Sequence, residues 1–308
     1  MHRRLPKLAC LFAAAVGAGV AGHLAVTPCV AASDDYERLD GLVYAGVAGE
    51  TLRADAYVPR GEGKRPGVLL VHGGAWTQGR RQAMAGFAER IASRGYTAVT
   101  IDYRLAPKHK FPAQLEDCRA ALVWMQAKQA KLKLDTTRIG GLGVSAGGHL
   151  VTLLATNPAV GDGDTGEAPA RLKMAVGLAA PCDFRSLPRD EPGLAYWLGG
   201  TRAEQPDRYR DASPASFVSP DDPPVLLIHG SKDRLVPVAN PRGMFRLLQA
   251  KGVPSELLVL EGGGHGAPAW RPESLAKMVA FFSEHLPPVV GGTSEAEGTT
   301  SPAPGVDS

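Results

Sequence analysis

The 308-residue sequence has little of what marks several common classes of protein. It holds only four cysteines, and two of them, Cys10 and Cys29, lie within the first 32 residues. The other two, Cys118 and Cys182, have no spacing that suits a metal site, so no structural metal centre is expected. We expect both thiols to be buried and free, although an oxidising compartment would also allow them to pair.

An excess of one charge is also missing once the N-terminus is set aside. Three of the 34 lysines and arginines lie in residues 1–32, which hold no acidic residue. The rest of the chain therefore balances 31 basic against 31 acidic residues. A chain without a basic excess has no electrostatic footprint for nucleic acid, so no nucleic-acid partner is expected. Internal repeats are absent as well.

The N-terminus itself has the pattern of a secretory signal. Three basic residues among the first seven precede an apolar stretch from Leu8 to about Val26, and small residues follow up to Ala32. This order predicts a signal peptide over residues 1–32, with cleavage after Ala32 and export to the periplasm or the medium. No stable membrane association is then expected after cleavage. The alternative is an uncleaved anchor, because the apolar stretch is nearly long enough to span a bilayer.

Composition changes again at the C-terminus. Residues 287–308 are rich in Gly, Ser, Thr and Pro and offer too little apolar surface to offset the entropy of ordering them. We expect a disordered tail there and one folded domain over residues 33–286. Within this domain, residues 183–224 lack strong periodicity and are expected to form a small lid or inserted helices.

The order of elements along the domain predicts an α/β fold. Two short strands come first, and apolar runs typical of strands buried on both faces then alternate with segments of helical spacing. The expected strands lie at 42–44, 52–57, 67–71, 97–101, 138–142, 174–179, 225–228 and 257–260, and the expected helices at 83–94, 115–131, 149–154, 241–251 and 273–285. Such alternation favours a mainly parallel, doubly wound sheet.

The most informative motif is Gly-Val-Ser-Ala-Gly at residues 143–147. A G-x-S-x-G pattern between a strand and a helix places the serine on a sharp, strained turn. Glycines two residues to either side avoid collisions with the neighbouring strand and helix. Ser145 is therefore a candidate nucleophile, and a purely structural glycine-rich turn is the alternative.

A serine hydroxyl becomes a useful nucleophile when a histidine takes its proton and a carboxylate orients that histidine. In a doubly wound sheet, such groups gather at the carboxyl ends of the strands. Asp233 and His265 follow the strands expected at 225–228 and 257–260. The chain order Ser145, Asp233, His265 is the order of an α/β-hydrolase triad.

Each assignment has a rival. Asp102 and Asp183 also follow apolar runs, but they lie on strands that do not fit this order. His229 competes with His265, although it stands at a strand end where backbone packing is tight. The occurrence of all three motifs in the expected order supports the triad assignment more strongly than any one motif does.

A further glycine-rich segment, residues 72–76 (His-Gly-Gly-Ala-Trp), follows the strand expected at 67–71. Attack on an ester creates an oxyanion, which needs backbone N–H groups already directed at it. Gly74, Ala75 and Ala146, the last being the residue after the nucleophile, are predicted to form this oxyanion hole. Chemistry of this kind requires neither a metal nor a cofactor, so none is expected.

Three segments, residues 72–76, 102–107 with 111–117, and the serine motif, resemble the α/β-hydrolase esterases. The chain resembles the hormone-sensitive-lipase-like group and, more closely, the bacterial feruloyl/acetyl-xylan esterase-like group. Val144 departs from the former, which usually has aspartate there, and too few residues precede the first strand for that group's N-terminal helical cap. In this setting Arg104 is expected to anchor the following loop rather than to take part in catalysis.

The resemblance implies an α/β-hydrolase fold and serine-dependent hydrolysis of small-molecule or carbohydrate esters with short or aromatic acyl groups, through an acyl-enzyme. Because no cap is present, Trp76, Tyr196 and Trp197 are predicted to line the acyl site. The alternative is that Tyr196 and Trp197 only pack the lid onto the sheet. An amide hydrolase, similar to kynurenine formamidase or to prolyl-oligopeptidase-type peptidases, is the rival activity. A non-catalytic binding protein of this fold should have lost a triad residue.

Overall fold

The computed structural model describes residues 35–157 and 171–288. The predicted signal peptide lies outside the described residues, as does the predicted tail beyond its first two residues. Over the described parts of the chain, no helix is both long and apolar enough to cross a membrane.

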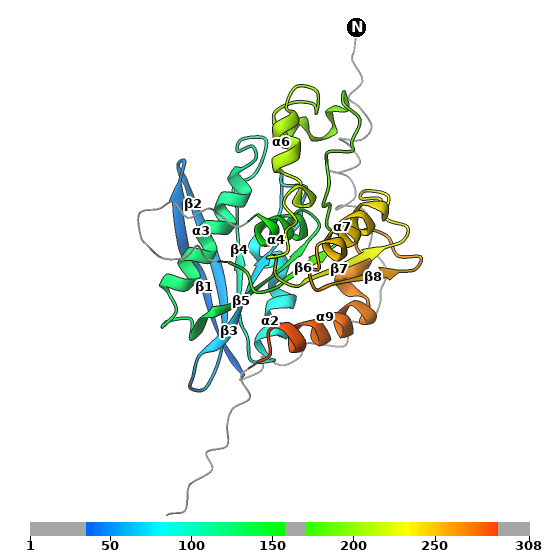
Figure 1. The fold of residues 1–308 in the computed structure, drawn as a ribbon. Helices are drawn as coiled ribbons and strands as arrows, with labels where there is room; N and C mark the ends of the chain where they lie inside the picture. Colours follow the sequence, from blue (N-terminus) through cyan, green and yellow to red (C-terminus); the bar gives the residue numbers. More distant parts are fainter. Residues whose placement is uncertain (1–34, 158–170, 289–308) are drawn as a thin grey trace, which may run out of the picture.

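An eight-stranded sheet forms the centre of the domain, in the order β1-β2-β4-β3-β5-β6-β7-β8 (Figure 1). At one edge β1 and β2 form an antiparallel hairpin, and β2 pairs antiparallel with β4. All other neighbours are parallel. The strands are β1 (Tyr36–Val47), β2 (Glu50–Pro59), β3 (Arg65–Val71), β4 (Thr97–Ile101), β5 (Leu134–Val144), β6 (Ala175–Leu178), β7 (Val225–Gly230) and β8 (Ser255–Leu260).

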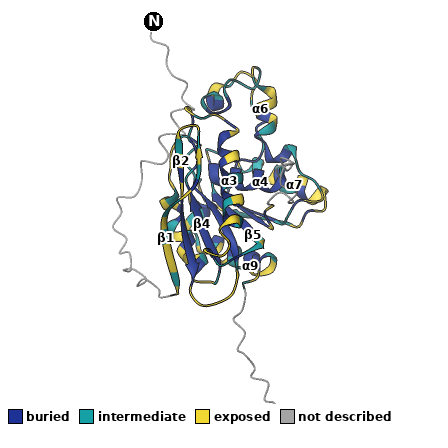
Figure 2. Ribbon diagram, turned by 90° about the vertical axis from the view of Figure 1, so that its left-hand side faces the viewer, coloured by how far each residue is buried: buried dark blue, intermediate teal, exposed yellow. Residues whose placement is uncertain are grey.

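The predicted mainly parallel sheet is thus confirmed, and the expected strands all exist. The hairpin strands β1 and β2 are longer than predicted, because backbone pairing continues where the apolar pattern stops. For β1 the reason is its place at the edge of the sheet, since Tyr44 is its one buried residue and the others are exposed or half-buried, whereas the central strands are mostly buried (Figure 2). A solvent-exposed strand has few apolar residues, so its ends are hard to predict from the sequence.

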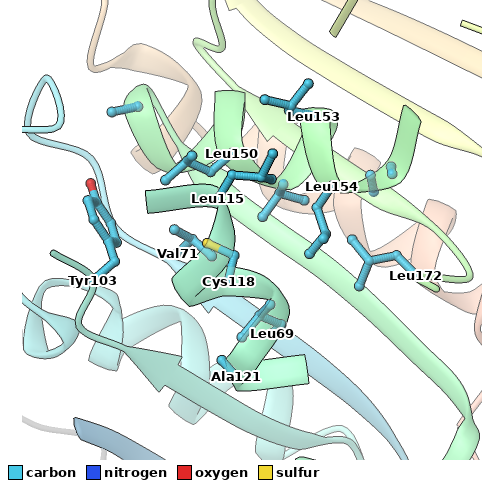
Figure 3. Close-up of a cluster of buried hydrophobic side chains, with 14 of the residues drawn as sticks. Leu69, Val71, Tyr103, Leu115, Cys118, Ala121, Leu150, Leu153, Leu154 and Leu172 are labelled. Carbon is cyan, nitrogen blue, oxygen red and sulfur yellow. The ribbon is translucent and has the colours of Figure 1, made fainter. Parts of the chain in front are cut away.

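Helices cover both faces of the sheet. Successive residues of a strand point to opposite faces. Leu69 of β3 accordingly joins the cluster with α3, α4 and α7, whereas Leu70 joins the cluster with α2 and α9. Figure 3 shows the first of these clusters, with α3 and α4 packed against strand side chains. The helices are α2 (Ala85–Ala92), α3 (Ala113–Ala127), α4 (Ala146–Thr156), α7 (Ala239–Ala250), α8 (Ala267–Trp270) and α9 (Pro272–His285), with a 3₁₀ turn η1 (Arg81–Met84) before α2.

Residues 183–224, expected to form a lid or inserted helices and called the lid below, contain only short helical pieces. They are η2 (Pro192–Leu194), α5 (Ala195–Leu198), α6 (Pro206–Asp211) and η3 (Pro214–Ser216). Proline occupies one of the first two positions of η2, α6 and η3, where its missing N–H is not needed. Turns of this length are too short to be stable alone, so their packing onto the domain must hold them.

Two smaller predictions are confirmed in the interior. Cys118 and Cys182 are both buried and free. Arg104 is an anchor, because its Nε donates to Asp117 at 2.9 Å and its Nη2 to Glu116 at 3.0 Å, both on α3.

Candidate active site

The three predicted triad residues come together at the carboxyl edge of the sheet. Ser145 follows β5, Asp233 lies in the loop after β7, and His265 lies in the loop after β8. Because β5, β6, β7 and β8 run parallel, their carboxyl ends lie at the same edge. The sheet therefore assembles groups that are 120 residues apart in the chain.

The turn at Ser145 is strained and tightly enclosed. Its φ of 54° and ψ of −118° lie where a side chain is rarely tolerated, at a cost of about 1–3 kcal/mol. The N–H of Ser145 donates to the carbonyl of Leu178 at 2.7 Å and holds the turn against β6. A Cβ on Gly147 would overlap the carbonyl oxygen of Val71, and one on Gly143 would overlap the next turn of backbone. Both flanking glycines are thus required by close backbone contact.

A continuous chain of hydrogen bonds joins the three side chains. His265 Nε2 lies 2.8 Å from Ser145 Oγ, and His265 Nδ1 lies 2.7 Å from Asp233 Oδ2. The Asp233 side chain is fully buried, whereas that of His265 is 23% exposed. A carboxylate facing Nδ1 keeps the proton on that nitrogen, so Nε2 is left as the acceptor for the serine hydroxyl. The imidazole is therefore in the tautomer that a general base requires.

Four nitrogen atoms surround the Asp233 carboxylate. Its Oδ1 accepts the N–H groups of Leu235 at 2.8 Å and Val236 at 2.9 Å, and its Oδ2 faces His265. His229 Nε2 is also 3.1 Å from Oδ2. Burial by itself would raise the pKa of Asp233, but the hydrogen bonds from His229, His265 and the backbone lower it well below its usual value. The group stays ionised beside His265.

His229, the rival for the catalytic histidine, does not contact Ser145. Its ring is buried, and its Nε2 lies 2.8 Å from the carbonyl oxygen of Val236 as well as near Asp233. Its Nδ1 has no hydrogen-bond partner among the described residues. The sequence did not predict this contact with the acid, because the spacing of four residues brings side chains together on a helix and not from a strand into a loop.

The rival acids are occupied elsewhere. Asp102 pairs with Arg81 at 2.7 Å, and Asp183 pairs with Arg185 at 2.8 Å. Neither carboxylate is bonded to His265. Among the described residues, His265 contacts the carboxylate of Asp233. The structure thus brings together the acid that the chain order predicted.

The loop after β3 lies directly against the nucleophile. A Cβ built on Gly73 would be 3.3 Å from the Cβ of Ser145. The next three residues all have positive φ: 123° at Gly74, 51° at Ala75 and 59° at Trp76. None of the hydrogen bonds found among the described residues uses the N–H of Gly74 or of Ala75.

The third candidate donor is Ala146, which opens α4, so its N–H has no partner within the helix. His72 bonds within its own loop, as predicted, with Nδ1 2.7 Å from the carbonyl oxygen of Gly73. The N–H groups of Gly74, Ala75 and Ala146 thus take part in none of the hydrogen bonds found among the described residues, and their role as an oxyanion hole stays a prediction.

The predicted acyl-site role of Trp197 is wrong. Its side chain is fully buried, and its ring stacks on that of Trp76 with centroids 3.8 Å apart and planes 2° apart. Its Nε1 donates to Gln114 at 3.0 Å. Trp197 therefore packs the lid onto the domain, which was the alternative, because an aromatic ring gains most when both faces leave water.

Trp76 and Tyr196 have different surroundings. Trp76 is almost fully buried, yet it contributes to the wall of a cavity of about 120 Å³ beside the loop that carries Asp233. The Tyr196 hydroxyl donates to the carbonyl oxygen of Ala75 at 3.0 Å. Other apolar walls of the cavity come from Phe184, Leu187, Leu194, Leu235 and Val236.

Comparison with known proteins places this geometry in a family. The BD-FAE family model matches residues 54–248. Esterase LipC of Mycobacterium tuberculosis is 34% identical over 215 residues, which are 65% of this chain and 53% of that protein. The probable carboxylic ester hydrolase LipM of the same organism is 34% identical over 190 residues, 59% of this chain and 44% of that protein. The chain thus spans about half the length of these curated relatives.

Solved structures agree on the fold. A truncated carbohydrate esterase from gut microbiota has a TM-score of 0.74 and 26% identity, and the match covers 82% of this chain and 98% of that one. A thermophilic esterase of Thermogutta terrifontis has a TM-score of 0.70 at 22% identity, covering 84% of this chain and 95% of the other. Because the family model spans more than half of the sequence, the chain belongs to the BD-FAE family and has the α/β-hydrolase fold.

Proposed function

We propose that this protein is a serine hydrolase that cleaves carboxylic esters through an acyl-enzyme. The observation that carries the proposal is the hydrogen-bonded chain from Ser145 through His265 to the buried Asp233. The names of the relatives LipC and LipM, an esterase and a probable carboxylic ester hydrolase, support the same reaction type.

The acylation step follows from the positions of the protons. His265 Nε2 takes the proton of Ser145 Oγ as that oxygen bonds to the ester carbonyl carbon, and the C=O electron pair moves onto the carbonyl oxygen. The N–H groups of Gly74, Ala75 and Ala146 stabilise this oxyanion. When the intermediate collapses, the alkoxy group leaves with the proton from His265, and the acyl group stays on Ser145.

Deacylation repeats the sequence with water. His265 Nε2 accepts a proton from the water as it attacks the acyl carbon, and returns that proton to Ser145 when the acid departs. The ionised Asp233 stabilises the imidazolium that exists between these two transfers. The hydrogen bonds that lower its pKa keep it from taking the proton itself.

For the substrate we propose esters of short or aromatic acids, including esters of carbohydrates. We assign the acyl group to the apolar cavity of about 120 Å³ beside the Asp233 loop, whose walls include Trp76 and Val236 but neither Ser145 nor His265. A cavity of this volume suits a small acyl group better than a long alkyl chain. A carbohydrate esterase among the structural neighbours supports a sugar as the alcohol. An amide hydrolase with the same triad is the rival activity.

Steady-state kinetics of the protein and of its Ser145→Ala variant test the proposal. The substrates are p-nitrophenyl esters from acetyl to lauroyl, acetylated xylan, a feruloylated sugar and N-formylkynurenine. We expect kcat/KM to be highest for the shortest esters, and Ser145→Ala to lower kcat by at least ~10³ with the fold intact. Turnover that survives this substitution contradicts the mechanism. A higher kcat/KM for N-formylkynurenine than for every ester favours the amide hydrolase, and a lauroyl optimum contradicts the short acyl site.

A further inference from the structure

The short helix α5 of the lid contacts the oxyanion loop through two successive residues. Tyr196 Oη donates to the carbonyl oxygen of Ala75 at 3.0 Å, a contact between residues 121 positions apart in the chain. Trp197 stacks its ring on that of Trp76. Adjacent residues of the lid therefore hold adjacent residues of the loop.

The part of the loop that they hold is strained. Ala75 and Trp76 carry side chains and yet have φ values of 51° and 59°. Each such residue costs about 1–3 kcal/mol and persists only when its surroundings enforce it. Because two occur in succession, the loop would relax if those surroundings were removed.

Hydrogen bonds fix the peptide planes on both sides of Ala75. The plane before it contains the carbonyl of Gly74, which accepts the N–H groups of Thr77 at 3.0 Å and Gln78 at 3.1 Å. The plane after it contains the carbonyl of Ala75, and Tyr196 is the only donor to this oxygen among the hydrogen bonds of the described residues. The direction of the Ala75 N–H is set by the first plane and kept from rotating by the second. Tyr196 thus closes the arrangement.

We propose that α5 positions the oxyanion hole and that Tyr196 is its positioning residue, holding Ala75 in the left-handed conformation that directs its N–H at the substrate oxygen. This inference rests on the proposed function, because an oxyanion forms only when Ser145 attacks an acyl carbonyl group. Tyr196 touches no reacting atom and acts through Ala75.

The helix that carries Tyr196 is itself firmly attached. Trp197 Nε1 donates to Gln114 Oε1 at 3.0 Å, and the carbonyl oxygen of Trp197 accepts the N–H of Phe111 at 3.0 Å. Gln114 in turn donates to the carbonyl oxygens of Arg104 and His109, at 3.0 and 2.7 Å. The support for the loop therefore extends to the buried side of α3.

Tyr196 is also a donor at every pH at which the triad works. Burial raises the pKa of its hydroxyl, so the proton stays on the oxygen in alkaline solution as well. The bond to Ala75 is then independent of pH. Loss of Tyr196 should lower the rate equally across the pH profile, whereas a group that titrates would change its shape.

Tyr196→Phe removes this hydroxyl and keeps the ring. Tyr44→Phe is the matched control, because the Tyr44 hydroxyl also donates to a backbone carbonyl, that of Asp102 at 2.6 Å, away from the oxyanion loop. Removal of an oxyanion donor lowers kcat by ~10²–10³. For a donor that is loosened rather than removed, we expect Tyr196→Phe to lower kcat by about 10-fold or more, with KM within about twofold.

A trifluoromethyl ketone forms a tetrahedral adduct whose oxygen occupies the oxyanion hole, so its affinity reports on the hole directly. We expect Tyr196→Phe to weaken this inhibitor by a factor similar to the loss in kcat, and Tyr44→Phe to leave both unchanged. Melting temperatures of the two variants should fall by similar amounts. An unchanged kcat in Tyr196→Phe, a rise in KM alone, or an equal loss of kcat in Tyr44→Phe overturns the inference.

Ser145→Ala in the same assay separates the two proposals. If Ser145→Ala stays active, the proposed function itself fails. If Ser145→Ala is inactive and Tyr196→Phe behaves like the native protein, only the role of α5 fails.

Discussion

Replacement of Asp233 by asparagine is a sharp test of the triad, because the site dictates how the amide must lie. The Oδ1 position accepts the N–H groups of Leu235 and Val236, at 2.8 and 2.9 Å. An asparagine can preserve these bonds only with its carbonyl oxygen there, which turns its NH₂ group toward the position of Oδ2. At that position it meets Nδ1–H of His265 and lies near Nε2 of His229, which also bonds to the carbonyl oxygen of Val236.

His265 can avoid this clash of donors only by moving its proton to Nε2. Its Nδ1 then accepts from the amide, and its Nε2, 2.8 Å from Ser145 Oγ, can no longer take the serine proton. A wrong tautomer of this kind lowers kcat by ~10⁴ in serine hydrolases, or about 5 kcal/mol of transition-state stabilisation. His229 loses the nearby negative charge but keeps its bond to the carbonyl oxygen of Val236, so the fold should be destabilised by about 1 kcal/mol.

The measurement is kcat with p-nitrophenyl acetate for Asp233→Asn, Asp183→Asn and Asp102→Asn, with a thermal melt of each. The two controls remove carboxylates that pair with Arg185 and Arg81, so they should change stability more than rate. A kcat for Asp233→Asn within tenfold of the native value refutes the argument. A larger loss of kcat in either control would identify that aspartate, and not Asp233, as the carboxylate of the triad.

Two further outcomes follow from the same geometry. Gly147→Ala should abolish the yield of folded protein, because its methyl group would overlap the carbonyl oxygen of Val71. Gly243→Ala on α7 is the control: a Cβ there meets open space, so this variant should match or exceed native stability in a thermal melt. His149 should destabilise the fold in acid, because burial lowers its pKa from 6.5 to about 4 and the unfolded chain therefore binds a proton first. From this group, the free energy of unfolding should fall by about 1.4 kcal/mol per pH unit as pH decreases from about 6.5 to about 4. In denaturant titrations at several pH values, His149→Asn should remove this contribution to the slope of the unfolding free energy against pH. An unchanged slope would contradict the assignment.

The triad could be predicted from the sequence because its constraints are local or topological. Close backbone contact around Ser145 requires glycine at positions 143 and 147, and both glycines can be recognised in the sequence as part of the G-x-S-x-G motif. Asp233 and His265 follow apolar runs, and parallel strands end at one edge of the sheet. No distance was needed to infer that these three groups meet.

The roles of the lid aromatics could not be predicted in this way. Trp197 is apolar and lies in a segment without periodicity, so the same sequence suits a pocket wall and a buried contact equally well. Its burial depends on Trp76 and Gln114, which lie far away in the chain. The contact of His229 with Asp233 was missed for a related reason, since only the path of the loop after β7 brings the ring back to the carboxylate.

A four-residue helix such as α5 has no stability of its own, so its position is set entirely by what it touches. It touches the core through Trp197 and the oxyanion loop through Tyr196 and Trp197. The loop is strained and needs such support, while α5 needs the ring of Trp76 to bury its own tryptophan. Each element therefore stabilises the other, and a change in the packing of α5 should alter the conformation of Ala75. If α5 positions Ala75 as proposed, the packing of this segment sets the rate of the chemical step.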